Sequence, residues 1–554
     1  MNFDKVIASL GAFGRYQKYI YFLVCLASVF SGLFTVISAV LLAVPQHRCK
    51  IPGYDNDTYT VQSRWHQSLI DQHIPSSKDG TYDNCHLYLL DNSSYWTNVS
   101  KVNCDAWVYS KDVFTETFTS MNNLVCRNAQ KTAMAKSFFF AGVLVGAITI
   151  GHISDVFGRK TSLLVGAILL IASTLSLAWS PNFTFFSVCM LFIGVASEGM
   201  YAPGLIIGLE LVGPSKRSFT GTLTNHFFAL GIMALSGMAY FIRHWKHLEL
   251  ACAVPCVFFL FYYWLLPESP RWLITKQRFS EAKKILRKAA RVNRVSLADD
   301  MLDISRIVEN TSKNRIGSGR KFCQLLNSRV FLPRMIIISF NMYMITLSYC
   351  RCVITMSYYG LTLNTENLGG NFYLNFCLSG LVELPAYTIP LLLMDRIGRK
   401  RLFFVCMIVC GVACISTLLT TIYLDQEYQS LNVTLALLGK LGISAAFSII
   451  LVYSAELFPT VVRGTALSSC SIFGRIGGIV ASYVAESGDL ISGRIGKAFP
   501  MLIFGVLSLV AAFLALILPE TMGQELPETI QDGVLFGKPE YKKDTVTNCM
   551  DGAV

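Results

Sequence analysis

Twelve stretches of about 20 mostly apolar residues recur along this chain, and each is long enough to cross the roughly 30 Å hydrocarbon core of a bilayer as one helix. Apolar residues make up 53% of the 554 residues and charged residues only 15%, a balance outside that of soluble globular proteins. The sequence therefore predicts an all-α, multi-pass membrane protein. The predicted spans cover residues 19–43, 134–153, 161–180, 185–208, 219–241, 248–266, 335–361, 371–394, 402–423, 431–454, 465–485 and 497–518.

The connections between these spans carry the charges that set orientation. Residues 271–334 contain sixteen Lys or Arg against five Asp or Glu, and two shorter basic turns occur at 158–160 (GRK) and 396–401 (RIGRKR). Loops rich in Lys and Arg stay on the cytoplasmic side of a membrane. We therefore expect both termini in the cytoplasm and segment 44–133 outside. This topology explains the net charge of +12, so we expect membrane lipid, and no nucleic acid, as a partner.

The long outer segment, 44–133, is typical of a region that faces an oxidising compartment. It contains four cysteines, which predict two disulfides; four cysteines allow three pairings, and all three stay open. Three Asn-x-Ser/Thr triplets in the same segment predict N-linked glycans. The cysteines are Cys49, Cys85, Cys104 and Cys126, and the glycan acceptors are Asn56, Asn92 and Asn98.

Short patterns recur in the same order in two parts of the chain. D-x-x-G-R-K begins at Asp155 and again at Asp395, 240 residues later. A Glu seven residues before an Arg also repeats, as does L-P-E-S/T. These patterns predict two six-helix halves in parallel orientation, the arrangement of major facilitator transporters. The predicted parts are the first half at 1–266, a cytoplasmic basic linker at 267–334, the second half at 335–522 and a cytoplasmic tail at 523–554.

The repeated charges fall at the predicted cytoplasmic ends of the spans. We expect Asp155 to pair with Arg159, and Glu456 to pair with Arg463. Such pairs would latch an inner gate as they break and re-form between conformations. The alternative is that they only fix loop structure and orientation. The complete predicted gating set is Asp155, Arg159, Glu210, Arg217, Asp395, Arg399, Glu456 and Arg463.

Four motifs together resemble one known family. CDAWVYSKDVFTETFTSMNNLVC (104–126), GHISDVFGRK (151–160), PESPRWLI (267–274) and ELFPTVVRGTALSS (456–469) are similar to the organic cation, organic anion and carnitine transporters of the solute carrier 22 family. The resemblance runs from the first span to Pro519. It implies a secondary transporter of the plasma membrane and not an enzyme.

Three further stretches are most similar to the carnitine and zwitterion branch of that family: VPQHRC (44–49), LNTENLGGN (363–371) and VELPAY (382–387). The seventh span departs from the family pattern, because it is longer and contains Arg351. The resemblance implies transport of small organic cations or carnitine-like zwitterions by alternating access. The alternative is an organic anion exchanger that uses Arg475.

Exposure to lipid is costly for ionisable residues inside the predicted spans, so we expect six of these residues to face the interior. They are Glu198, His226, Arg351, Glu383, Lys440 and Arg475. The planar guanidinium of Arg475 suits a substrate carboxylate, and the resemblance supports this role because the anion and carnitine branches share an arginine there. Glu383 is then the counter-charge for a substrate ammonium, and Glu198 holds Arg475 between substrates. The structural alternative is a plain Glu198–Arg475 pair.

Aromatic residues near these charges complete the predicted site, because aromatic faces attract quaternary ammonium groups. Packing and interfacial roles are the commoner use of such residues in membranes. We expect Lys440 and His226 to make helix contacts and not to bind substrate. No metal site, catalytic motif or nucleotide-phosphate loop is predicted, sodium coupling stays open, and a monomer is expected. The candidate pocket aromatics are Tyr201, Phe228, Tyr358, Tyr359, Phe447 and Phe473.

Overall fold

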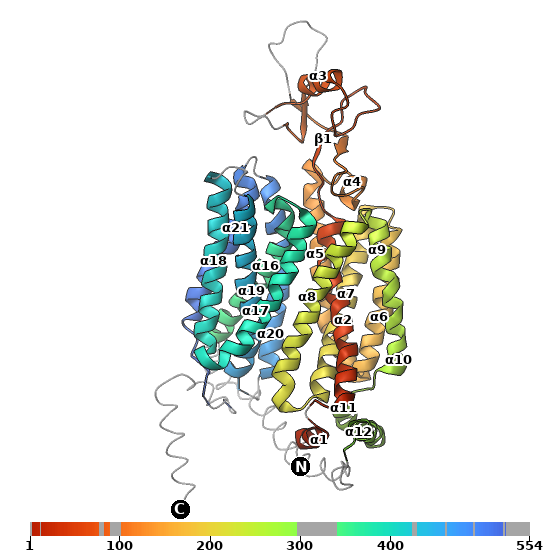
Figure 1. Ribbon diagram of the computed structural model, residues 1–554, viewed down its shortest axis with the longest axis vertical. Coiled ribbons are helices and arrows are strands. Elements are labelled where there is room, and N and C mark those ends of the chain that lie inside the picture. Colours follow the sequence, from red (N-terminus) through yellow and green to blue (C-terminus); the bar gives the residue numbers. More distant parts are fainter. Residues whose placement is uncertain are drawn as a thin grey trace, which may run out of the picture.

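The computed structural model describes residues 3–11, 13–76, 82–88, 101–295, 341–423, 429–459, 463–490, 494–524 and 527. Long helices form two bundles that stand side by side (Figure 1), which confirms the prediction of two six-helix halves. The first bundle consists of α2 (Arg15–Leu41), α5 (Ala129–Phe157), α6 (Arg159–Ala178), α7 (Phe183–Leu211), α8 (Arg217–Phe241), and a sixth stretch of α9 (Trp245–Ala253), η3 (Val254–Phe261) and α10 (Tyr262–Leu265). The second consists of α16 (Asn341–Leu363), α17 (Phe372–Ile397), α18 (Arg399–Tyr423), α19 (Gln429–Leu457), α20 (Arg463–Glu486) and α21 (Arg494–Ala515).

In the described part of the chain, ten of these stretches are long and apolar enough to cross a membrane. The other two are α8 and α16, where polar residues such as His226 and Arg351 lower the mean hydropathy. Helix ends that lie within the described residues differ from the predicted span limits by at most five residues, the largest difference being at the second span, predicted from residue 134, where α5 begins at Ala129. The predicted start of the seventh span at residue 335 lies outside the described residues.

The sixth stretch is not a continuous α-helix. Pro255 follows the last residue of α9, Ala253, by two positions. Proline donates no backbone N–H and its ring crowds the preceding turn. The chain therefore continues from Val254 to Phe261 as a 3-10 helix before one last α-helical turn, α10. The predicted single span at 248–266 is thus correct in position but changes its winding midway.

Two glycines make the turns that the D-x-x-G-R-K repeat predicts. Gly158 joins α5 to α6 with φ of 110°, and Gly398 joins α17 to α18 with φ of 97°, backbone angles that residues with a Cβ rarely adopt. A Cβ at Gly158 would also clash with the carboxylate of Glu268, and one at Gly398 would lie 2.6 Å from that of Glu520. The glycines therefore admit an acidic side chain at each turn.

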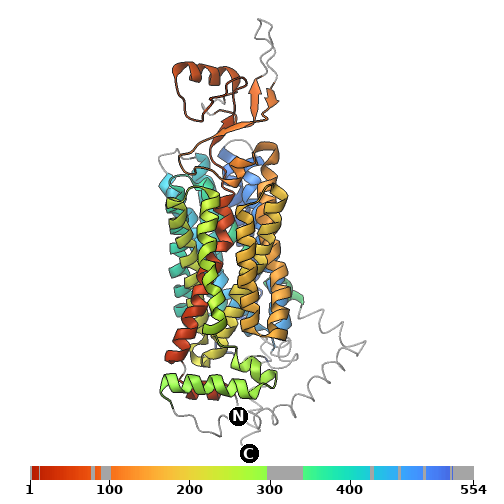
Figure 2. The ribbon, with the colours of Figure 1, turned by 90° about the vertical axis from the view of Figure 1, so that its right-hand side faces the viewer.

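The two ends of the bundle carry different appendages. The outer end, as we name it here, carries the segment between α2 and α5, and the inner end carries α1 (Phe3–Ser9), α11 (Pro270–Thr275) and α12 (Phe279–Asn293) (Figure 2). The Asn293 side chain fastens α12 to the start of the chain, since its Nδ2 donates to the Leu10 carbonyl at 2.9 Å and its Oδ1 accepts from the Tyr16 N–H at 2.9 Å. The described beginning of the predicted linker is therefore helical and packed.

The outer segment folds as a small domain above the bundle (Figure 2). Strand β1 (His47–Cys49) pairs with β4 (Trp107–Tyr109), and β2 (His86–Tyr88) pairs with β3 (Lys101–Asn103), both antiparallel. The sequence did not predict these strands. Cys49 bonds to Cys104 and Cys85 to Cys126, one of the three pairings left open. Asn56 is exposed, whereas Asn92 and Asn98 lie outside the described residues.

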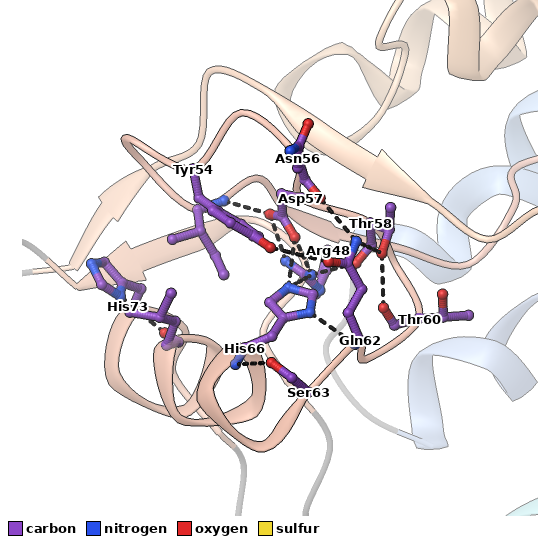
Figure 3. Close-up of polar contacts among 12 residues, drawn as sticks. Arg48, Tyr54, Asn56, Asp57, Thr58, Thr60, Gln62, Ser63, His66 and His73 are labelled. Carbon is purple, nitrogen blue, oxygen red and sulfur yellow. Dashed lines mark hydrogen bonds and ion pairs between the residues drawn. The ribbon is translucent and has the colours of Figure 1, made fainter.

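A buried ion-pair network holds this domain together (Figure 3). The Arg48 Nη1 donates to Asp57 Oδ2 at 3.0 Å, the His66 Nε2 lies 2.9 Å from Asp57 Oδ1, and the Ile51 N–H donates to Asp57 Oδ2 at 2.8 Å. Helix α3 (Arg64–His73), capped by the Ser63 hydroxyl, supplies the histidine. Burial raises the pKa of Asp57, but these hydrogen bonds outweigh burial and leave the pKa below its ordinary value of 3.8.

Candidate functional site

The halves are tied together at the outer end. Lys136 of α5 forms an ion pair with Glu486 of α20. The hydroxyl of the next residue, Ser137, lies 3.2 Å from the hydroxyl of Tyr483, which is one turn before Glu486 on α20. On the other side of the bundle, the Ser236 hydroxyl of α8 donates to the carbonyl of Tyr373 in α17 at 2.6 Å. Neither Lys136 nor Glu486 was singled out from the sequence, although Lys136 falls inside a predicted span. These contacts close the outer end.

A second ion pair joins the halves near mid-bundle. The Arg475 Nη2 of α20 donates to the Glu198 Oε1 of α7, and the Arg475 Nη1 also donates to the Ser471 carbonyl at 3.3 Å. Both side chains keep some exposure, 19% for Arg475 and 13% for Glu198. The structure thus brings together the two residues that the sequence predicts as partners.

A cavity leads from Glu198 of the mid-bundle pair toward the inner end of the molecule. This cavity of about 120 Å³ is lined by Glu198, by Pro203 one turn farther along α7, and by Gly151, Ser154 and Asp155 of α5. Asp155 lies at the inner end of α5, so the cavity runs from the middle of the bundle to that end. The halves are thus in contact at the outer end, and this cavity, lined by α5 and α7 of the first half, reaches the inner end.

A line of aromatic rings extends from the mid-bundle pair into the second half. The distance between ring centres is 4.6 Å for Tyr359 of α16 and Phe140 of α5, and 5.0 Å for Tyr358 and Tyr359. The ring centre of Phe447 on α19 lies 5.6 Å from that of Tyr358. The predicted pocket residues Tyr358, Tyr359 and Phe447 are therefore neighbours. Phe473 differs from the prediction, because it is 46% exposed on the bundle surface.

Helix α8 faces the same region. The Tyr201 hydroxyl, three residues after Glu198 on α7, lies 3.1 Å from the Asn225 side chain, and the Tyr201 and Phe228 rings are 6.0 Å apart. His226 Nε2 lies 2.9 Å from the Thr388 hydroxyl of α17, so this histidine makes a contact between the halves, as expected of a helix-contact residue. These residues frame the site from the first half.

The carboxylate of Glu383 lies in a separate buried cluster and already has a base as its partner. Lys440 Nζ is 3.1 Å from Glu383 Oε1, and the Tyr387 hydroxyl donates to Glu383 Oε2 at 3.0 Å. Lys440 also donates to the Tyr358 carbonyl at 3.1 Å and lies 3.5 Å from the centre of the Tyr358 ring. From the sequence, Glu383 is expected to be the counter-charge for a substrate ammonium. In the structure its charge is already neutralised by Lys440, so a substrate would have to displace Lys440.

At the inner end, each half contains one arginine that holds two acids. Arg159 Nη1 is 3.0 Å from Asp155 and its Nε is 3.8 Å from Glu210. Arg399 Nη2 is 3.0 Å from Asp395, and its Nε is 3.0 Å from Glu456. Each cluster stays within its own half in this conformation.

The predicted Glu456–Arg463 pair is wrong in this conformation. Glu456 pairs with Arg399, and the Arg463 Nε donates instead to the Phe458 carbonyl at 3.1 Å. In the first half the equivalent Arg217 Nε donates to the Leu209 carbonyl at 3.3 Å. Glu456, at the end of α19, therefore faces the start of α18 and not the start of α20.

Two further acids belong to these clusters and were not singled out from the sequence. Glu268 accepts hydrogen bonds from the backbone N–H groups of Arg159 and Lys160, at 3.0 and 3.2 Å. Glu520 accepts from the corresponding groups of Arg399 and Lys400, at 2.9 and 3.1 Å. The repeated L-P-E-S/T motif was the signal for them. Its hydroxyl matters too, because Ser269 donates to Glu210 and Thr521 donates to Glu456.

Known proteins of similar sequence and structure agree with this architecture. A family model described as "Sugar (and other) transporter" matches residues 53–532. The organic cation transporter protein of Drosophila melanogaster is 34% identical over 98% of this chain and 97% of its own length. The organic cation/carnitine transporter 2 of Homo sapiens is 32% identical over 98% and 96%, and the solute carrier family 22 member 21 of Mus musculus is 33% identical over 96% and 93%.

Among solved structures, the xylose transporter XylE from E. coli in a partially occluded inward-open conformation covers 92% of this chain with all of its own. The TM-score is 0.61 at 15% sequence identity. At that identity the similarity establishes the fold alone, which is that of the major facilitator superfamily.

Proposed function

Because the chain belongs to the sugar (and other) transporter family and, within it, to the solute carrier 22 family, we propose that it carries small organic cations and carnitine-like zwitterions across the plasma membrane by alternating access. The relatives named for organic cation and carnitine transport match almost the whole chain, which supports this substrate class. We further propose that it acts as a monomer with both termini in the cytoplasm.

The observation that carries the proposal is the Glu198–Arg475 ion pair. It joins the two halves near mid-bundle, borders the cavity that opens to the inner end, and keeps part of both side chains exposed. The cationic group of a substrate entering that cavity competes with Arg475 for Glu198. Binding there replaces a contact between the halves with contacts to the substrate, and a transporter needs this coupling of occupancy to conformation.

The distribution of contacts at the two ends supports alternating access. The outer end is closed by pairs between the halves, such as Lys136–Glu486. The inner clusters around Arg159 and Arg399 keep their charges within one half, so they are available to meet when the inner ends approach. Rocking of the halves would therefore open the outer pairs and bring the inner clusters together.

The alternative, an organic anion exchanger that uses Arg475, has less support. The guanidinium of Arg475 already has the carboxylate of Glu198 as its partner, so an anion that bound Arg475 would have to leave Glu198 uncompensated in a partly buried site. A zwitterion avoids that cost, because its cationic end pairs with Glu198 while its carboxylate replaces the negative charge that a guanidinium of the site loses.

An uptake screen with purified protein in lipid vesicles tests the proposal. Carnitine, glycine betaine, tetraethylammonium and p-aminohippurate are compared, each with and without a sodium gradient. We expect saturable uptake of the cation and the zwitterions, and loss of both in Glu198→Gln protein that still inserts. Uptake of p-aminohippurate alone would overturn the proposal in favour of the anion exchanger, and the sodium arms decide whether sodium is coupled.

A further inference from the structure

Arg351 is a buried charge without an acidic partner among the described residues. It lies on α16 with 9% of its surface exposed, and the Nε and Nη1 atoms of its guanidinium are buried without a hydrogen-bond partner. The other basic residues buried between described helices have acids: Lys136 has Glu486, Lys440 has Glu383, and Arg475 has Glu198. A charged group buried alone is costly, so its presence calls for an explanation.

The side chain of Arg351 lies on the face of α16 that forms the aromatic part of the site. Thr355, Tyr358 and Thr362 follow it at four, seven and eleven residues, which places all four on one stripe of the helix. The Phe447 ring of α19 contacts two residues of this stripe, with its centre 5.8 Å from the Arg351 guanidinium carbon and 5.6 Å from the Tyr358 ring centre. Arg351 therefore belongs to the same cluster of side chains as Tyr358 and Phe447.

Arg351 is also close to the mid-bundle ion pair. α16 packs tightly on α20 beside it, because a Cβ at Gly474 would lie 3.1 Å from the Thr355 hydroxyl and 3.8 Å from the Arg351 carbonyl oxygen. Arg475 follows Gly474 in the chain and is near enough to Arg351 for the two charges to repel. Of the residues that the structure describes, two guanidinium groups and one carboxylate, Glu198, thus share this region, which leaves one positive charge uncompensated among them.

We propose that Arg351 binds the carboxylate of a zwitterionic substrate, and that it, rather than Arg475, is the main anionic anchor of the transport site. The substrate carboxylate supplies the negative charge that the site lacks and accepts hydrogen bonds from the guanidinium, whose Nε and Nη1 atoms have no hydrogen-bond partner. The cationic end then points across the site to Glu198, past the rings of Tyr359 and Phe447. This proposal rests on the proposed transport function and names the residue that selects a zwitterion over a plain cation.

The geometry favours Arg351 over Arg475 on one ground. A carboxylate that binds Arg475 has to compete with Glu198 for the same guanidinium, whereas one that binds Arg351 displaces no protein acid among the described residues. The same difference predicts that a substrate without a carboxylate gains nothing from Arg351 and is repelled by its charge.

Matched substrates separate this role from a structural one. Carnitine and carnitine methyl ester share the trimethylammonium and hydroxyl groups and differ in the negative charge. Initial uptake rates of both are measured over a concentration series for wild type, Arg351→Gln, Arg351→Lys and Arg475→Lys, and normalised to the protein at the cell surface. We expect Arg351→Gln to raise the KM for carnitine about tenfold or more and the KM for the ester by less than about twofold. Arg351→Lys should fall between.

A binding measurement on purified protein gives a second readout that does not depend on transport. Carnitine should raise the melting temperature of the wild type but not of Arg351→Gln, while tetraethylammonium should stabilise both. Equal changes in KM for carnitine and its ester, or no change in either, would overturn the role of Arg351. Uptake of the ester but not of carnitine by the wild type would overturn it as well and leave cation transport standing. Uptake of neither would overturn the transport function and this inference together.

Discussion

Glu268 and Glu520 occupy the same place in the two halves of the molecule. Each carboxylate accepts the backbone N–H groups of the Arg and Lys that begin a helix, α6 for Glu268 and α18 for Glu520. The first N–H groups of a helix have no partner inside it, and the helix dipole favours a negative charge there. The repeat in sequence is therefore a repeat of one capping interaction, and it holds the inner turn of each half in place.

Replacing these caps should weaken the protein and slow its turnover. We expect Glu268→Ala and Glu520→Ala each to cost about 1–2 kcal/mol of stability, because two helix N–H groups lose their acceptor. Glu268→Gln, which keeps one acceptor oxygen, should cost less. Thermal unfolding of the purified variants gives the stability and vesicle uptake gives the turnover. Glu281 is the matched control, because its pair with Arg278 is half exposed and Glu281→Ala should change little.

The protein should tolerate a swap of the two charges of the Glu198–Arg475 pair better than the loss of one of them. Glu198→Gln leaves the guanidinium of Arg475 without its acid, and breaking a buried pair in this way costs about 3 kcal/mol or more. We expect low surface expression and no uptake. The double variant Glu198→Arg with Arg475→Glu restores opposite charges across the halves and should recover expression. Surface biotinylation measures this; a double variant that expresses no better than Glu198→Gln would contradict a direct pairing between the halves.

Breaking the outer ion pair should shift the protein toward outward-facing states. In Lys136→Gln the charge of Glu486 loses its counterpart across the halves, so the closed outer end loses a contact that the open one does not need. A cysteine placed at Ser137, which contacts Tyr483 across the same gap, should then react faster with a membrane-impermeant thiol reagent added outside. Ser137→Cys with Lys136 intact is the control. Equal reaction rates would show that this pair does not hold the outer end closed.

The outer domain should lose stability in acid through Asp57. Its pKa is lower in the folded protein than the ordinary 3.8, so its ionised form stabilises the fold. This contribution is complete above about pH 3.8 and is lost as the pH falls toward the lower folded-state value. Proteolysis of the purified protein between about pH 6 and about pH 2.5 should show this loss in wild type. Asp57→Asn, which preserves the Asn56 glycan triplet, should be less stable at neutral pH and lack the acid step.

Helix positions and the twofold repeat could be predicted from the sequence because both depend on local pattern. A span is a run of apolar residues, so α8 at Arg217–Phe241 was placed at 219–241. Which helices touch depends on packing between segments far apart in the chain, and no periodicity reports it. Glu383 was therefore assigned to a substrate, although Lys440 on α19 lies beside it. The pairing of Arg399 with Glu456 was missed for the same reason.

For the site too, the sequence predicts which charged residues face the interior but not which residues they contact. The cost of charges in lipid predicted that Glu198 and Arg475 face inward, and the structure places them together. The same reasoning drew attention to Arg351 but could not tell that, unlike the other basic residues of the site, it would have no acid beside it in the described part of the chain. Chain topology brings acids and bases together in pairs, so only the folded molecule reveals which charge is left over.

The central claim, that the halves alternate around a site containing Glu198 and Arg475, is tested most directly by exchange. Vesicles containing the purified protein are loaded with unlabelled carnitine or left empty, and the initial uptake of labelled carnitine is measured in both, for wild type and for Glu198→Gln. A carrier whose loaded form reorients faster than its empty form should take up label faster into the loaded vesicles, with saturation, and Glu198→Gln should abolish the uptake. Uptake that rises linearly with concentration, is the same in loaded and empty vesicles and survives in Glu198→Gln would contradict the account.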